Sequence, residues 1–267
     1  MSKVVLVILD GLEYSTAQQC MGGLLALCNA NMGKIYKMKS ELPSISRPLY
    51  ECILTGVKPA LSGILNNYCK PFSSNKSIFE YAKLANLKAG AAAYYWISEL
   101  YNKTLFDRVK DRIIINEQSL NIPYGIFYYE DDYNDSHLFS DAECLRVKFD
   151  LDFTLFHSMN IDDIGHKFSH DSKEYRNAAR KVDTILSSLV LKWLEEGVNV
   201  IITSDHGMNN DGTHGGNLDI ERDVAFFVFG DKFSFARVEV EQSGICGLVC
   251  EILGVDHDKS FAKELLK

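Results

Sequence analysis

The sequence predicts an α/β fold with a mainly parallel central sheet and helices on both of its faces. Short runs of β-branched and other apolar residues alternate along the chain with longer amphipathic stretches, which is the pattern of such folds. Two of these runs, VVLVIL (4–9) and VNVIITS (198–204), are almost wholly apolar, as expected of strands covered on both faces. Helices must therefore supply both covering layers.

The other elements are expected from local patterns. The stretch 49–56 has helical spacing, with Ser46 and Pro48 just before it and Gly56 at its end. The stretch 173–197 is a long amphipathic helix that ends at its glycine. Further helices are expected over 76–88 and 244–254, and further strands over 89–97, 149–157 and 224–230.

The length of 267 residues and a hydrophobic content of 46% suit a single α/β domain. We expect one domain over 1–267, with a small cap or insertion at about 98–147, where the pattern is least regular. Within it, the acidic aromatic stretch YYEDDYNDSH (128–137) is interpreted as a solvated loop.

The composition narrows the classes of partner. A net charge of −8 makes a nucleic acid polymer a poor partner, because binding it requires clustered cations, whereas a small anionic substrate held by metal is compatible. The longest apolar runs are strand-sized, so we expect no membrane partner. Seven scattered cysteines without a CxxC pair indicate reduced thiols and predict a cytoplasmic protein. The oligomeric state cannot be predicted.

Acids and histidines gather where predicted strands end. Asp10 follows the first strand, Asp162 and His166 follow the strand over 149–157, and Asp205 with His206 end the strand over 198–204. Singly, these residues have ordinary explanations, such as an Asp-Gly turn or a helix cap. Because parallel strands present their carboxyl ends at one edge of the sheet, the residues together indicate a metal site there.

Two details refine this candidate site. Asp162 and His166 are four residues apart, so one helical turn places them on the same face, although Asp163 could replace Asp162 by sequence alone. In the loop SDHGMNNDGTHGG, His214 is flanked by glycines that permit close backbone approach, and Asp211 is interpreted as a turn residue.

The set LDG, PSISRPLYECILTGVKPALSGILNN, DDIGH, SDHGM and GTHGG resembles the alkaline phosphatase superfamily, most closely its nucleotide pyrophosphatase/phosphodiesterase branch. Order and spacing match along nearly the whole chain, with about 70–145 outside the motifs. The resemblance implies two zinc ions and a Ser or Thr nucleophile. One metal would be bound by Asp10, Ser46, Asp205 and His206, and the other by Asp162, His166 and His214. Carboxylates and imidazoles without thiolates suit zinc, with manganese or iron as alternatives.

By this resemblance Ser46 is the nucleophile. It sits just before a predicted helix, where backbone N–H groups favour negative charge, and metal coordination would lower its pKa. An N-cap serine would have the same local geometry. Asn67, in GILNN, matches a phosphate-contacting Asn of the family and could donate to a phosphoryl oxygen; Asn66 is the competing assignment.

Two features depart from the family pattern. Arg47 follows the nucleophile, where the phosphodiesterase branch commonly has an aromatic residue, so it could grip a second anionic group or pair with Glu51. Only eight residues separate His206 from His214, a spacing similar to that of the membrane-embedded phosphoethanolamine transferases that act on glycolipid anchors. Histidines 137, 157, 170 and 257 match no family ligand and are interpreted as structural or surface residues.

These observations predict a two-metal phosphohydrolase. Ser46 would attack phosphorus in line, and water would hydrolyse the covalent phospho-enzyme intermediate. The predicted substrate class is a phosphodiester or pyrophosphate in a small molecule. A phosphomonoesterase or phosphonate hydrolase on the same scaffold is the alternative within enzymes, and a non-catalytic metal-binding relative is the third hypothesis.

Overall fold

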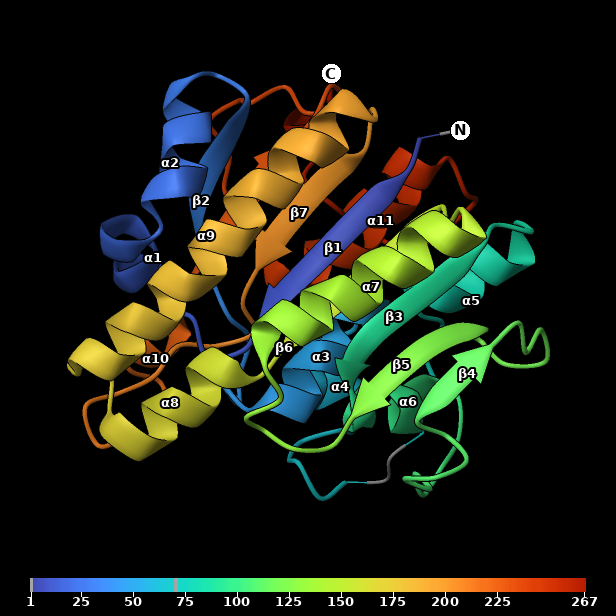
Figure 1. The fold of residues 1–267 in the computed structure, drawn as a ribbon, viewed down its shortest axis with the longest axis horizontal. Helices are drawn as coiled ribbons and strands as arrows, with labels where there is room; N and C mark the ends of the chain where they lie inside the picture. Colours follow the sequence, from blue (N-terminus) through green and yellow to red (C-terminus); the bar gives the residue numbers. More distant parts are fainter. Residues whose placement is uncertain (1, 70–71) are drawn as a thin grey trace.

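The computed structural model describes residues 2–69 and 72–267. Within these residues one eight-stranded sheet forms the centre of the molecule (Figure 1). Five adjacent strands, from β7 to β5, are parallel, whereas β8 runs antiparallel to both of its neighbours and β4 runs antiparallel to β5. The predicted, mainly parallel sheet is therefore confirmed. In sheet order the strands are β2 (Gly33–Lys39), β8 (Asp223–Phe229), β7 (Asn199–Thr203), β1 (Val4–Leu9), β6 (Phe153–Ser158), β3 (Ala89–Tyr94), β5 (Tyr124–Tyr128) and β4 (Ile113–Ile115).

Helices cover both faces of this sheet. On the face toward the viewer in Figure 1, α9 (Lys173–Glu195) and α7 (Asp135–Phe149) lie over the sheet and run roughly along the strands. The helices α1 (Tyr14–Cys20), α2 (Gly22–Asn29) and α8 (Asn160–Phe168) pack against α9. The opposite face carries α3 (Ser46–Thr55), α5 (Ile78–Leu84), α6 (Tyr95–Tyr101) and α11 (Ile245–Leu253). Short elements complete the chain: α4 (Pro59–Ser62), α10 (Asp219–Arg222), and the 3₁₀ turns η1 (Gln242–Gly244) and η2 (Lys263–Leu265).

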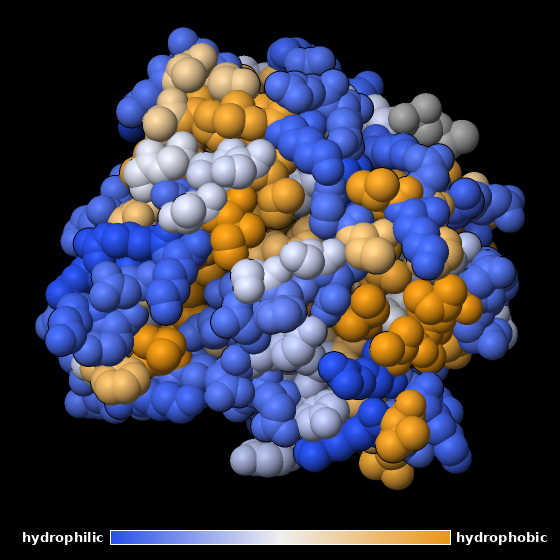
Figure 2. Space-filling view, in the orientation of Figure 1, coloured by the Kyte–Doolittle hydropathy of each residue, from blue (hydrophilic) through white to orange (hydrophobic). Residues whose placement is uncertain are grey.

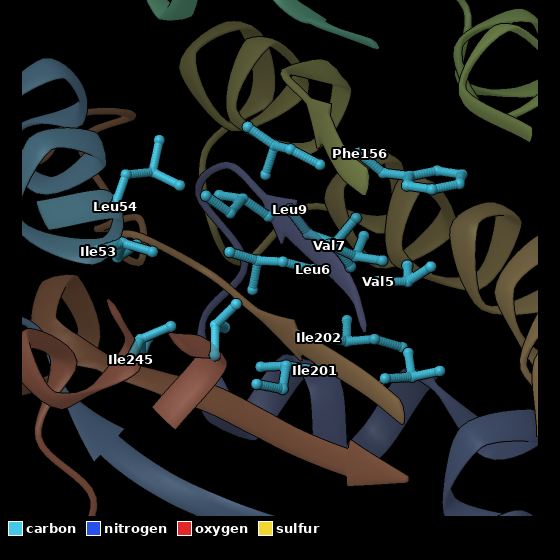
Figure 3. Packing of buried hydrophobic residues seen from close by; sticks show 14 of the residues in the cluster. Val5, Leu6, Val7, Leu9, Ile53, Leu54, Phe156, Ile201, Ile202 and Ile245 are labelled. Atoms are coloured by element: carbon cyan, nitrogen blue, oxygen red, sulfur yellow. The ribbon is translucent and has the colours of Figure 1, made fainter. Parts of the chain in front are cut away.

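The core lies around the central strand. Every side chain of β1 is at most 1% exposed, because helices cover both sides of its alternating residues. In Figure 3, Ile53 and Leu54 of α3 and Ile245 of α11 lie on one side of β1, where their packing fixes α3 to the sheet. Each such buried aliphatic side chain contributes about 1.5–3 kcal/mol.

Some predicted boundaries were wrong. The strand expected over 89–97 ends at Tyr94, because the chain turns there into α6. The strand expected over 149–157 begins only at Phe153, because α7 occupies the preceding residues and Asp150 closes it in a left-handed conformation with φ 53°. The segment 12–45, for which nothing was predicted, forms α1, α2 and β2.

The irregular segment 98–147 joins the central sheet. It holds β4 and β5, which extend one edge, and most of α7, which packs on β3 and β6. The interpretation of 128–137 as a solvated loop was wrong in part. Asp131 and Asp132 are exposed, but Asp135 is buried, and the rings of Tyr128 and Tyr133 stack with centroids 5.0 Å apart.

The visible surface is mostly hydrophilic. The face shown in Figure 2 is hydrophilic over much of its area, with apolar patches at the upper left beside α2 and on the right. Among the described residues, no helix combines the length and the apolar character needed to cross a bilayer.

Candidate active site

Three buried carboxylates meet at the carboxyl edge of the sheet. Asp10 directly follows β1, Asp205 lies two residues beyond the end of β7, and Asp162 lies in the first turn of α8, just after β6. Since β1 pairs with both β6 and β7, the three strands bring their ends side by side. Asp10 and Asp205 are 0% exposed and Asp162 is 4% exposed. The topology therefore concentrates negative charge in one buried place.

Each of these carboxylates keeps one oxygen without a hydrogen-bond partner. The unpartnered atoms are Oδ1 of Asp10, Oδ1 of Asp162 and Oδ2 of Asp205. Burial and the neighbouring carboxylates raise the pKa of Asp162 and raise that of Asp205 well above its usual range. An ionised carboxylate that is buried without a partner costs several kcal/mol, so the three unpartnered oxygens are candidate ligands for cations.

The histidines that join this centre are fixed in the tautomer that metal binding requires. Nδ1 of His166, His206 and His214 donates to the carbonyl oxygens of Gly212, Gly207 and Ser44, respectively, at 2.8–2.9 Å. The Nε2 atoms of His206 and His214 are thereby left as acceptors. Burial lowers the pKa of His206, and burial together with the charge of His206 lowers the pKa of His214 to about 4, so both rings are neutral at pH 7.

The donor atoms form two groups that share one histidine. Ligand atoms of Asp10, Asp205 and His206 lie within 4.8 Å of one another, as do those of Asp162, His206 and His214. The rings of His206 and His214 stack with centroids 3.6 Å apart, so the two groups are contiguous. Carboxylate and imidazole donors in such number suit a divalent cation of the zinc type.

His166 lies at the rim of this centre. Its side chain is 43% exposed, and its Nε2 is 3.3 Å from Oδ2 of Asp162. This contact with Asp162 raises the pKa of His166 to about 9, so cation binding there would displace a proton. The competing Asp163 instead pairs with Lys167, with 2.6 Å between Oδ2 and Nζ. Asp211 lies exposed in the turn between His206 and His214.

Ser46 is the first residue of α3, and its side chain lies in the same cluster of carboxylates and histidines. Its Oγ lies 3.1 Å from Nε2 of His206, and because that nitrogen is an acceptor, the hydroxyl donates to it. The alternative of an N-cap serine was wrong: the cap residue is Ile45, which makes no side-chain cap bond. Five of the expected ligands lie in the two groups, and Ser46, 3% exposed, contacts His206; His166 lies at the rim, outside both groups.

Arg47 occupies a different environment from either one anticipated. It is 4% exposed, forms an ion pair with Glu99, and lies 5.1 Å from the ring centroid of Trp96. The predicted partner Glu51 instead accepts hydrogen bonds from Ser73, Asn75 and Tyr101. The guanidinium is thus neutralised inside the protein, and the expectation that it grips a second anion finds no support in this geometry.

Asn67 is attached to the nucleophile helix. Its Oδ1 accepts from the backbone N–H of Arg47 at 3.0 Å, which leaves its half-buried amide NH₂ for another acceptor. Asn66, the competing assignment, accepts from the N–H of Tyr68 in a local turn at 2.8 Å. The amide of Asn67 is therefore tied to the residue after Ser46, whereas Asn66 serves the loop.

Two further residues contact the centre and were not anticipated. The hydroxyl of Tyr50 donates to Oδ2 of Asp10, and Nε2 of His157 lies 3.8 Å from the same oxygen. His157, interpreted as structural or surface, is completely buried at the end of β6. Burial opposes ionisation of Asp10, but His206, His157 and Tyr50 outweigh it and lower the pKa of this carboxyl. The position of Tyr50 four residues after Ser46, on the same helix face, was the one sequence signal for it.

The fold is that of the alkaline phosphatase superfamily. Within that superfamily, the chain belongs to the type I phosphodiesterase/nucleotide pyrophosphatase family, whose family model matches residues 4–215.

Curated relatives share the sequence at low identity. The chain is 20% identical over 265 residues to GPI ethanolamine phosphate transferase 3, catalytic subunit, of Mus musculus, covering 90% of this chain and 23% of that protein. It is 31% identical over 108 residues to GPI ethanolamine phosphate transferase 3 of Saccharomyces cerevisiae, covering 40% of this chain and 10% of that protein. The chain thus spans less than a quarter of the length of either relative.

Solved structures share the fold. Murine ectonucleotide pyrophosphatase/phosphodiesterase 5, solved as an inactive variant with AMP, has a TM-score of 0.77 and 15% identity, with 100% of both chains covered. The C-terminal periplasmic domain of EcEptC from Escherichia coli, solved in complex with Zn, has a TM-score of 0.67 and 13% identity, with 99% of this chain and 87% of that chain covered.

Proposed function

We propose that this protein is a metal-dependent enzyme that cleaves phosphodiester or pyrophosphate bonds of small molecules, with Ser46 as its nucleophile. The observation that carries the proposal is the position of Ser46. Its hydroxyl contacts His206 at 3.1 Å, beside three buried carboxylates that each keep one unpartnered oxygen. A structural serine would need no such concentration of negative charge around it.

The residues present fit two divalent cations, most simply zinc. Asp10, Asp205 and His206, with Ser46 beside them, would hold one ion, and Asp162, His214 and the rim residue His166 would hold the other. Ions bound there would neutralise the carboxylates, lower the pKa of the serine hydroxyl and offset charge that develops on phosphoryl oxygens.

The chain's own groups then perform two tasks. Ser46 at the start of α3 presents its oxygen at a helix N-terminus, where the backbone favours an anionic group. The free amide of Asn67 donates to a phosphoryl oxygen and is held in place by its bond to the N–H of Arg47. The Ser46 oxygen forms a bond to phosphorus as the bond to the leaving oxygen breaks, and the leaving oxygen takes up a proton.

The fate of the covalent intermediate, in which Ser46 is esterified to the phosphorus that keeps its remaining substituent, separates two candidate activities. Attack by water, with return of a proton to Ser46, completes hydrolysis. Attack by an alcohol completes a transfer, and this second candidate is favoured by the curated relatives, which are ethanolamine phosphate transferases. Members of the fold contain AMP or Zn in the solved structures, which supports a small phosphate ester and zinc in either case.

The test compares turnover of bis-p-nitrophenyl phosphate and p-nitrophenyl phosphate by the zinc-loaded protein and by Ser46→Ala. We expect the diester to be preferred and the variant to lose at least about 10³-fold in kcat. Ser62→Ala, which removes a hydroxyl on α4 that bonds to the backbone of Pro59 and Ile64, is the control and should retain activity. Undiminished turnover by Ser46→Ala would exclude the mechanism, whereas preference for the monoester would exclude only the substrate class. Added ethanolamine or glycerol that captures the phosphoryl group would favour transfer.

A further inference from the structure

The carboxylate of Asp10 is held asymmetrically. Its Oδ2 accepts a hydrogen bond from the hydroxyl of Tyr50, which is itself completely buried. Its Oδ1 has no hydrogen-bond partner and lies 3.4 Å from Nε2 of His206. One oxygen therefore faces the protein and the other faces the candidate metal centre.

His157 places an N–H group on the same side of the carboxylate, just beyond hydrogen-bond distance. Its Nδ1 accepts from the backbone N–H of Tyr94 at 3.3 Å, so the proton of the neutral ring lies on Nε2. That Nε2 has no hydrogen-bond partner and lies 3.8 Å from Oδ2 of Asp10. The parallel register pairs His157 with Ile8, two residues before Asp10, and thus fixes the imidazole beside the carboxylate.

The side chains of Tyr50 and His157 also pack against each other. The rings of Tyr50 and His157 meet edge to face with centroids 4.4 Å apart, and the hydroxyl of Tyr50 lies 3.2 Å from Sδ of Met159. The carbonyl of His157 accepts from the hydroxyl of Tyr128 at 2.7 Å. This packing leaves Tyr50 and His157 little freedom to turn away from Asp10.

We propose that Tyr50 and His157 are positioning residues for Asp10, which reserve its Oδ1 as a single-oxygen ligand on the Ser46 side of the centre. The inference rests on the proposed function, because it assumes that a cation binds there. Tyr50 lies one helical turn after Ser46 on α3, so its bond to Asp10 also sets the placement of the nucleophile helix relative to that ligand. Groups that orient ligands in this way commonly change metal affinity by about 10–100-fold.

The experiment measures zinc affinity by competition with a chromophoric chelator, which requires no substrate. Tyr50→Phe deletes only the hydroxyl, and His157→Leu deletes the N–H donor. We expect each to bind the more tightly held zinc about 10-fold or more weakly than wild type. His157→Gln, whose amide offers a donor near the position of Nε2, should recover most of the affinity.

The matched control is Tyr101→Phe. This change also deletes a buried tyrosine hydroxyl that donates to a carboxylate. The hydroxyl of Tyr101 lies 2.9 Å from Oε2 of Glu51, which is on α3 but is not one of the three clustered carboxylates. Tyr101→Phe should leave zinc affinity within about 2-fold of wild type while lowering the urea midpoint of unfolding. Circular dichroism of the metal-free proteins verifies folding. If Tyr50→Phe does not fold, the comparison of His157→Leu with His157→Gln still tests the positioning role.

The outcomes separate the two proposals. If wild type binds no zinc, the proposed function fails and this inference fails with it. If wild type binds zinc and the Tyr50 and His157 variants match the Tyr101→Phe control, only the positioning role is overturned. A loss of affinity in His157→Leu that His157→Gln does not restore would likewise exclude the role of the Nε2 donor.

Discussion

The hydroxyl of Ser46 lies 3.1 Å from Nε2 of His206, although 160 residues separate them in the chain. The contact joins the start of α3 to the loop after β7, across the carboxyl edge of the sheet. The unpartnered oxygens of Asp10, Asp162 and Asp205 are part of the same buried cluster. The following predictions depend on the charge, the backbone and the packing around this contact.

Neutralising one carboxylate should stabilise the metal-free protein. In Asp205→Asn a permanently neutral group of the same shape replaces a carboxyl whose ionisation is opposed by burial and by the charges of Asp10 and Asp162. We expect a rise of roughly 1–3 kcal/mol in the free energy of unfolding without metal at pH 7, and a smaller stabilisation by added zinc. Urea unfolding with and without zinc measures both. A less stable metal-free variant would contradict the inferred repulsion.

A side chain at position 11 should destabilise the protein for two reasons, the backbone conformation there and the closeness of Asp162. The φ of Gly11 is +74°, and a Cβ there would lie 2.8 Å from Cα of Asp162, so Gly11→Ala adds a steric conflict to backbone strain. The matched control is Gly63→Ala, at φ +75° with no heavy atom within 4 Å of the added Cβ. We expect the control to cost about 1–2 kcal/mol and Gly11→Ala clearly more, with weaker zinc binding in Gly11→Ala alone. Equal costs for the two would show that Asp162 is free to move.

The buried ion pair of Arg47 should support stability and leave substrate binding unaffected. Arg47→Met leaves the carboxylate of Glu99 unpaired at 12% side-chain exposure, so we expect a loss of about 3–5 kcal/mol in unfolding free energy. Where the variant is folded, KM for bis-p-nitrophenyl phosphate should stay within about 3-fold of wild type. A rise in KM beyond 10-fold with unchanged kcat would instead assign Arg47 to substrate binding.

Acid should weaken the connection between α7 and α9. Burial opposes ionisation of Glu143, but hydrogen bonds from Arg146, Trp193 and Lys192 lower its pKa from 4.5 to about 2. Its folded pKa is below its unfolded value, so the stability it supplies is complete above pH 4.5 and is lost as the pH falls toward 2. Glu143→Gln should cost about 2 kcal/mol at pH 7 and flatten the decline in that pH window. Unfolding curves from pH 7 to 2 measure this, and parallel declines for both proteins would refute the assignment.

The strands and long helices could be predicted because their patterns are local. The apolar run of β1 and the glycine that closes α3 were visible in the sequence, and both elements lie where they were expected. Edge strand β4 was missed because it has only three residues, and two of them are exposed. α7 was missed because acidic and apolar residues alternate in it without a clear amphipathic period.

In the site, too, the residues with a local sequence signal could be predicted and the long-range contacts could not. Residue types and spacing at strand ends were sufficient to predict Asp10, Asp162 and Asp205, because parallel strands must present those positions together. No local pattern could pair Arg47 with Glu99 or direct His157 toward Asp10, since both contacts depend on which strands become neighbours. Long-range pairs of this kind require the sheet order.

The most direct test of the central claim counts zinc ions per chain by elemental analysis after dialysis against buffered Zn²⁺. We predict two ions in wild type, and one in Asp205→Asn and in His214→Ala, because each change removes a donor from a different group around His206. One ion or none in wild type, or the same content in all three folded proteins, would contradict a paired-metal centre at Ser46.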